Sequence, residues 1–332
     1  MKKLFTLLMI VSVIVSCRKD DSSFDGNNIQ EMYSDFMVLS TFKVDKDSID
    51  FANGEKAVFS AQFNKPVSWK ISIKGQTSKA EKIITGQTKF IDATNATWNG
   101  STTVFPMFKA ENCIAQLTID GVADTFQVQT KVKSLKVNQG LVIADFENGF
   151  SPSWTKFVQT GANMDFNIKN DTLCPQGAKY LRMAGTVNWD YLIGLIDYPA
   201  TAYGTTKTLN LSANPNDVYF NCLIYGESAS NPSIVLFQFK EDENADGSIN
   251  GNSDDQYDYQ INVNWIGWKL VTIKYADLVT LVNGQPSTPK GNSQHNPDKI
   301  GKISMLHLAD PSQGFAACKI DYIMFTSAPL EP

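Results

Sequence analysis

The stretch 67–74 reads Val-Ser-Trp-Lys-Ile-Ser-Ile-Lys, with an apolar residue at every odd position and a polar residue at every even position. Successive side chains of a β-strand point to opposite faces, so this period of two predicts a strand with one buried face. Trp69 belongs to the apolar set, and we therefore expect it to lie in a core rather than in a ligand site. The pattern favours a β-structure, and we therefore examine the flanking residues for further strands.

Similar short runs flank this strand and predict an N-terminal β-sandwich over residues 35–133. Turn dipeptides such as Asn53-Gly54, Asn99-Gly100 and Asp120-Gly121 separate the runs. About seven short strands in roughly a hundred residues are typical of an immunoglobulin-like sandwich. The further runs are 36–42, 57–63, 83–85, 102–108, 113–119 and 125–132.

A second strand-rich block spans residues 141–327, after a short polar join. Helical periodicity is nearly absent from it, and about ten strand-like runs suit a two-sheet jelly roll. The sequence therefore predicts an all-β chain, with an N-terminal immunoglobulin-like β-sandwich followed by a C-terminal β-jelly roll. The runs are 141–146, 179–184, 191–196, 207–211, 218–226, 234–240, 257–263, 269–274, 302–308 and 319–325.

The N-terminus has the pattern of a secretory signal. Residues 1–17 read MKKLFTLLMIVSVIVSC, in which two lysines precede a short apolar run and a small residue precedes Cys17. Residues 14–17, Ile-Val-Ser-Cys, resemble the lipobox of bacterial lipoproteins. That resemblance implies a signal peptide over 1–16 and a lipidated Cys17; the alternative is an ordinary signal peptide with an incidental cysteine.

The residues after Cys17 suggest where the anchored protein faces. Residues 18–21, Arg-Lys-Asp-Asp, resemble the export signal of Bacteroidetes surface lipoproteins. The polar segment 17–34 is expected to be a flexible tether. We therefore expect an outer-membrane protein, held by its lipid anchor and facing the cell exterior.

Composition narrows the possible functions. The full chain has a net charge of −5, and removal of residues 1–16 takes two lysines and no acid. The absence of a basic run excludes nucleic acid as an expected partner. Two histidines without HExxH or CxxC company argue against zinc, and no G-x-S-x-G, P-loop or dinucleotide motif is present. A glycosidase needs only two carboxylates, such as Asp190 and Glu227, but nothing marks such a pair.

Three motifs in the second block resemble one known family. They are Ile-Ala-Asp-Phe-Glu-Asn-Gly at 143–149, Gly-Trp-Lys-Leu-Val-Thr-Ile-Lys-Tyr-Ala-Asp-Leu at 267–278, and Lys-Ile-Asp-Tyr-Ile-Met-Phe at 319–325. In this order they resemble jelly-roll carbohydrate-binding modules of the galactose-binding-like fold. With the lipobox, the chain resembles surface glycan-binding lipoproteins of Sus-type systems, which implies a glycan ligand, a Sus-type import complex as partner and no catalysis. The alternatives are a structural or adhesion lipoprotein that binds protein, and a glycoside-active enzyme.

A sugar site needs aromatic rings for C–H faces and polar groups for hydroxyls. The segment Asn188-Trp189-Asp190-Tyr191 combines both before a predicted strand. Trp154 and Tyr203 lie in loop-like sequence and are expected to join it, while Asn262 and Trp265 offer a second edge. Any one of these aromatics has core packing as its alternative role.

Calcium is the expected cofactor, at two places. Residues 242–247 follow D-x-N-x-D-G, the start of an EF-hand-type loop, which nominates Asp242, Asn244 and Asp246. Asp254 or Asp255 would supply the late carboxylate, and a solvated loop without an ion is the alternative. The family resemblance implies a second, structural ion held by Glu147 and Asp321, whose alternative roles are surface hydrogen bonding and a strand-end cap.

Four cysteines remain after removal of the signal. Cys113, Cys174, Cys222 and Cys318 are widely spaced and show no metal-binding pattern. An exported protein can form disulfides, whereas apolar surroundings favour buried thiols. The sequence leaves both states open.

Overall fold

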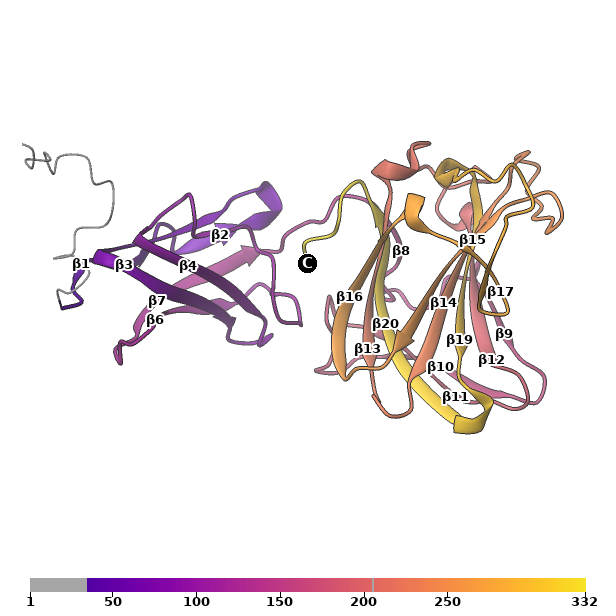
Figure 1. Cartoon of the computed structure of the whole chain (residues 1–332), viewed down its shortest axis with the longest axis horizontal. Coiled ribbons are helices and arrows are strands. Elements are labelled where there is room, and N and C mark those ends of the chain that lie inside the picture. The colour runs from indigo at the N-terminus through magenta and orange to yellow at the C-terminus, as the bar shows by residue number, and fades with distance from the viewer. Residues whose placement is uncertain (1–34, 205) are drawn as a thin grey trace, which may run out of the picture.

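The computed structural model describes residues 35–204 and 206–332, and these fold into β-sheets (Figure 1). The helical segments among them are short 3-10 turns of three residues each. The all-β prediction is therefore confirmed. The predicted signal peptide, Cys17 and the tether lie outside the described residues.

The N-terminal part is a seven-stranded sheet of order β1-β3-β6-β7-β2, with β4 and β5 paired to β3. The sequence-predicted strand 67–74 lies in β3, where Trp69 is 2% exposed and Ile71 and Ile73 are fully buried. Its immunoglobulin-like topology stays a prediction. The strands are β1 (Val38–Val44), β2 (Ser48–Asp50), β3 (Ala57–Gly75), β4 (Glu81–Ile91), β5 (Thr97–Trp98), β6 (Asn112–Ile119) and β7 (Phe126–Ser134).

The C-terminal part is a jelly roll made of two facing sheets (Figure 1). One sheet has the order β10-β11-β20-β13-β16, with β8 on β20, and the other has the order β15-β14-β19-β12-β9. The strands are β8 (Leu141–Ala144), β9 (Thr155–Val158), β10 (Asn163–Lys169), β11 (Tyr180–Thr186), β12 (Leu192–Pro199), β13 (Tyr219–Gly226), β14 (Ser233–Glu241), β15 (Gln256–Val263), β16 (Gly267–Lys274), β17 (Thr280–Val282), β18 (Gln285–Ser287), β19 (Ile300–Leu308) and β20 (Phe315–Thr326).

Each part has its own hydrophobic core. In the N-terminal part, the Trp98 ring packs edge-on against Phe51 and Phe108, with ring centroids 4.8 Å apart in both pairs. In the jelly roll, side chains from both sheets meet between the layers, among them Phe220 and Phe237 at 4.6 Å. Along β14, alternate residues are buried, so one face of the five-stranded sheet lies in the core and the other faces outward.

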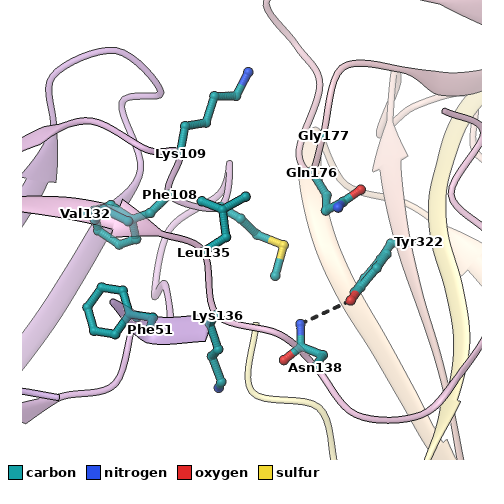
Figure 2. A pocket seen from close by; sticks show the side chains of 12 residues that line it. Phe51, Phe108, Lys109, Val132, Leu135, Lys136, Asn138, Gln176, Gly177 and Tyr322 are labelled. Atoms are coloured by element: carbon teal, nitrogen blue, oxygen red, sulfur yellow. Dashed lines mark hydrogen bonds between the residues drawn. The ribbon is translucent and has the colours of Figure 1, made fainter. Parts of the chain in front are cut away.

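The N-terminal and C-terminal parts contact each other through two backbone hydrogen bonds outside the segment that connects them. Met107 N donates to Pro175 O at 2.7 Å, and Thr102 N donates to Pro332 O at 2.6 Å, which returns the C-terminus to the N-terminal sheet. Between the parts lies a cavity of about 260 Å³, crossed by a hydrogen bond from Asn138 Nδ2 to Tyr322 Oη (Figure 2). It is smaller than ordinary ligand pockets of roughly 300–1,000 Å³, and we assign no ligand to it.

All four described cysteines are buried free thiols. Burial raises the pKa of Cys113 to about 12, with the nearby Glu111 carboxylate adding to the effect. These thiols therefore stay protonated at neutral pH and serve as small apolar side chains in the structure.

Candidate functional site: an aromatic rim on the jelly roll

Trp189 and Tyr191 lie at one end of the jelly roll, in the segment between β11 and β12. Their exposed fractions are 68% and 48%. The segment is tied to the neighbouring 309–314 loop at both ends, because Val187 N donates to Gly314 O at 2.7 Å and Ala309 N donates to Tyr191 O at 3.0 Å. Two large aromatic rings are thus exposed to solvent, on a backbone that hydrogen bonds hold in place.

Polar groups accompany these rings. Asn188 is exposed and Asp190 is half-buried, with its Oδ1 accepting a hydrogen bond from Tyr191 N at 2.7 Å. Phe315, the first residue of β20, is 49% exposed and pairs in register with Thr186 just before the segment. Phe315 is a rim residue that sequence reasoning missed, because it opens a strand that is otherwise buried.

Trp154 and Tyr203 are not brought to this rim, contrary to the sequence-based expectation. Trp154 directly precedes β9, whose Thr155 pairs with Asp197 near the far end of β12, and Tyr203 follows β12. A strand of eight residues separates the ends by about 26 Å, at roughly 3.3 Å per residue. Both side chains pack against the jelly-roll core, so we remove them from the candidate site.

Asn262 and Trp265 lie at the same end of the jelly roll as Trp189, but across the sheet. Asn262 is exposed on edge strand β15, where it pairs with Ile234 of β14. Strand β15 lies three strands away from β12 in this sheet. At roughly 4.8 Å per strand, β15 and β12 are about 14 Å apart. The half-buried Trp265 ring donates from Nε1 to Gly267 O at 3.1 Å and carries Lys269 Nζ at 4.8 Å from its centroid. Its ring is therefore engaged in packing.

The outward face of the five-stranded sheet lies between these two edges. Phe157, Leu195 and Leu306 stand in register on neighbouring strands and form an apolar row. In the next row, Asp197 accepts hydrogen bonds from Ser304 Oγ at 2.5 Å and Lys302 Nζ at 3.2 Å. Phe157 is 46% exposed, whereas Leu306 is 9% exposed and Ser304 is fully buried, so only part of this face is accessible. Sequence reasoning missed it, although the residues alternate with core residues along each strand.

The predicted calcium loop uses its acidic side chains internally. Asp242, which is fully buried, accepts hydrogen bonds from Asp246 N at 3.1 Å and Gly247 N at 2.7 Å. Asp254 Oδ2 accepts from Asn250 N at 2.6 Å. Asn244 Nδ2 donates to Asp246 Oδ2 at 2.9 Å, so these residues shape the loop. An ion at this set stays a prediction.

Glu147 and Asp321, the second predicted pair, lie on the same side of the jelly roll. Asp321 is fully buried; its Oδ1 accepts from Tyr322 N at 2.8 Å, and its Oδ2 has no hydrogen-bond partner among the described residues. Burial raises the pKa of Asp321 to about 9, and the nearby Glu147 and Asp145 carboxylates add to the rise. Glu147 Oε1 already accepts from Ala178 N and Lys179 N. An ion at this pair stays a prediction.

Glu227 does not have the properties of a glycosidase acid. Its carboxylate accepts two hydrogen bonds from Arg182, at 2.8 and 3.0 Å, and one from Lys319 at 2.6 Å. Burial works to raise the pKa of Glu227, but these hydrogen bonds and charges outweigh it and hold the pKa below its usual range. A general acid needs the opposite shift.

Comparisons with known proteins find likeness at the level of solved structures alone. No protein-family model and no curated protein matches the chain. A family 11 carbohydrate-binding module from Clostridium thermocellum, in complex with a β-1,3-1,4-mixed-linked tetrasaccharide, is 16% identical with a TM-score of 0.40, covering 58% of this chain and 98% of that one.

Two further neighbours illustrate the range. A carbohydrate-binding module specific for non-crystalline cellulose is 12% identical with a TM-score of 0.36, covering 57% of this chain and 97% of its own. An exo-β-agarase is 13% identical with a TM-score of 0.38, covering 58% of this chain and 26% of the enzyme. The neighbours thus include carbohydrate-binding modules and a part of an enzyme, and at these identities and TM-scores we draw no conclusion about the ligand from them.

Proposed function

We propose that this protein is a non-catalytic glycan-binding lipoprotein of the outer membrane that captures oligo- or polysaccharide through its C-terminal jelly roll. The observation that carries the proposal is the exposure of Trp189 and Tyr191 on a rim fixed by backbone hydrogen bonds. Exposed rings beside amide and carboxylate groups match the two chemical faces of a sugar. Phe157, which is 46% exposed on the outward face of the five-stranded sheet, would extend the contact along a longer chain.

The anchoring part of the proposal rests on sequence. The Ile-Val-Ser-Cys run ending at Cys17 and the following Arg-Lys-Asp-Asp support a lipid-anchored protein facing the cell exterior, in reach of a Sus-type import complex. Among residues 35–204 and 206–332, no helix is long and apolar enough to cross a membrane. The ion pairing of Glu227 supports the non-catalytic reading over the glycosidase alternative.

Replacing Trp189 with alanine is the direct test of glycan binding. We expect affinity to fall about five-fold or more, because the loss of one stacking ring costs about 1 kcal/mol. The melting temperature should hardly change, since the ring is 68% exposed. Titration calorimetry with a soluble polysaccharide that binds the wild type gives the affinity, and a thermal melt gives the stability.

Phe90→Ala is the matched control, because Phe90 is a 48% exposed ring on β4 of the N-terminal sheet. It should leave binding unchanged. If Trp189→Ala instead lowers stability by about 3–5 kcal/mol, the ring is a core residue and the proposal fails. If a broad panel of neutral and acidic glycans does not bind the wild type, the protein-adhesion alternative takes its place.

Cys17→Ser tests the anchor. Acyl chains on Cys17 are the anchor that the sequence predicts, so the variant should leave the membrane fraction and appear in the soluble fraction. Fractionation followed by immunoblotting measures this, with Ser16→Ala as the control that keeps a small residue before the cysteine. A Cys17→Ser protein that still pellets with membranes would contradict the lipoprotein assignment.

A further inference from the structure

Three carboxylates meet at the end of the jelly roll remote from Trp189. Glu241 closes β14, Glu243 follows in the loop, and Asp255 directly precedes β15. One oxygen of each lies within 4.8 Å of the others. Glu241 is fully buried and Asp255 is 1% exposed, so two of the three carboxyl groups are enclosed away from solvent.

The hydrogen bonds of the two glutamates leave one oxygen of each unused. Glu241 Oε1 accepts from Tyr275 Oη at 2.8 Å and from Asn296 N at 2.7 Å. Glu243 Oε2 accepts from Lys299 Nζ at 3.1 Å. Glu241 Oε2 and Glu243 Oε1 are buried without any hydrogen-bond partner among the described residues. Buried polar atoms are almost always paired, so these two oxygens either share a proton between the carboxyl groups or bind a cation.

Asp255 completes the cluster from the opposite side. Its Oδ1 accepts from Gly291 N at 2.6 Å and its Oδ2 from Ser293 N at 2.7 Å, and each oxygen keeps a further lone pair. A Cβ at Gly291 would lie 2.9 Å from Asp255 Cγ, so the backbone there fits closely around the carboxylate. The buried Tyr257 Oη, also without a partner, adds a further oxygen near the same charges.

The net charge of the ionised cluster suits a divalent cation as its ligand. Without an ion, burial raises the pKa of Glu241 to about 8. When all three carboxyl groups are ionised as ligands, they carry three negative charges, and Lys299 supplies one positive charge through its ion pair with Glu243. Two negative charges remain, which a divalent cation would neutralise. The donors are all oxygens on irregular loop and strand-end positions, a combination that suits the flexible coordination of Ca²⁺ better than the octahedral demands of Mg²⁺.

We propose that Glu241, Glu243 and Asp255 form a calcium site that joins the ends of β14 and β15 to the 291–299 loop. The site differs from the sequence-predicted one in its residues: Asp242, Asp246 and Asp254 accept backbone hydrogen bonds within the loop that carries Glu243. It is independent of glycan binding, since it lies at the opposite end of the sheet.

Calcium titration of the whole protein tests the site, with Glu241→Gln and Glu243→Gln as paired variants. We expect calcium to raise the melting temperature of the chelator-treated wild type by mass action, and each variant to lower calcium affinity at least ten-fold by calorimetry. Glutamine keeps the shape of the side chain, and Glu243 lies in a loop, so at least one variant should fold. Asp246→Asn is the matched control in the same loop and should keep the response.

Three outcomes would overturn the proposal. One is a wild-type melting curve and calorimetric trace that do not respond to calcium. Another is a calcium response that both glutamine variants retain while Asp246→Asn or Asp321→Asn abolishes it, because the ion would then lie at another site. Magnesium is the comparison ion, and binding as tight as that of calcium would overturn the assignment of the ion.

Discussion

Replacing Asp321 with asparagine is expected to stabilise the protein at neutral pH in the presence of a chelator, by up to about 4 kcal/mol. Asp321 is fully buried, and burial raises its pKa to about 9, helped by the Glu147 and Asp145 carboxylates. Unfolding lets this carboxyl ionise at its ordinary pKa of 3.8. Ionisation of this carboxyl therefore lowers the free energy of the unfolded state but not that of the folded state.

The sign and the pH window follow from that difference. Between about pH 4 and pH 9 the folded state holds a proton on Asp321 that the unfolded state has released. The stability of the wild type should thus fall as pH rises through this window, by about 1.4 kcal/mol per pH unit from this group. Asparagine does not titrate, so the difference between the two proteins should grow with pH and level off above pH 9.

Urea unfolding of both proteins across pH 5 to 8 measures the effect, with the exposed Asp124→Asn as the control that should change little. Equal pH slopes for the wild type and Asp321→Asn would contradict the expectation. Repeating the series in calcium examines the predicted ion between Glu147 and Asp321. A bound cation would keep the carboxylate ionised and remove the slope from the wild type.

Trp154→Ala is expected to cost about 3 kcal/mol of stability and to leave glycan affinity unchanged. The Trp154 ring packs edge-on against Tyr198 at 4.9 Å and against Phe146 at 6.0 Å, and both partners are almost fully buried. Truncation would leave a cavity at the edge of the jelly-roll core. The loss lies at the end of β12 opposite to Trp189, which separates it from the proposed sugar rim.

Urea unfolding and glycan titration of Trp154→Ala, side by side with Trp189→Ala, give the comparison. The two tryptophans should behave as opposites, one changing stability and the other changing affinity. A Trp154→Ala protein that keeps its stability but binds glycan more weakly would return Trp154 to the binding site.

The β-fold could be predicted from local patterns where one face of a strand is buried. Residues 67–74 alternate because β3 lies over a core, and the alternation remains visible in the sequence. Strand β9 escaped notice because all four of its residues are exposed, so nothing in their apolarity alternates. Residues 207–211 have a strand-like pattern but form no ladder; Leu209 packs into the core from a loop.

The candidate sugar site also has a part that the sequence predicts and a part that depends on the fold. Asn188 to Tyr191 could be recognised because the rings and polar groups are neighbours in sequence, and one short segment carries them. The prediction that Trp154 and Tyr203 join them was wrong, because residue types do not show the path of the chain. Strand β12 carries the chain to the other end of the sheet before Tyr203. The outward sheet face around Asp197 depended on strand order, which residue types alone do not specify.

The acidic loop shows most clearly what tertiary structure decided. Sequence alone determined that carboxylates are dense between 241 and 255 and that calcium is a suitable ion for them. It could not tell which carboxylate oxygens lack a hydrogen-bond partner: backbone N–H groups of the loop donate to Asp242 and Asp254, whereas Glu241 Oε2 and Glu243 Oε1 have no partner among the described residues. Only folding brings Glu241 and Asp255 together with the 291–296 segment and encloses both carboxyl groups away from solvent.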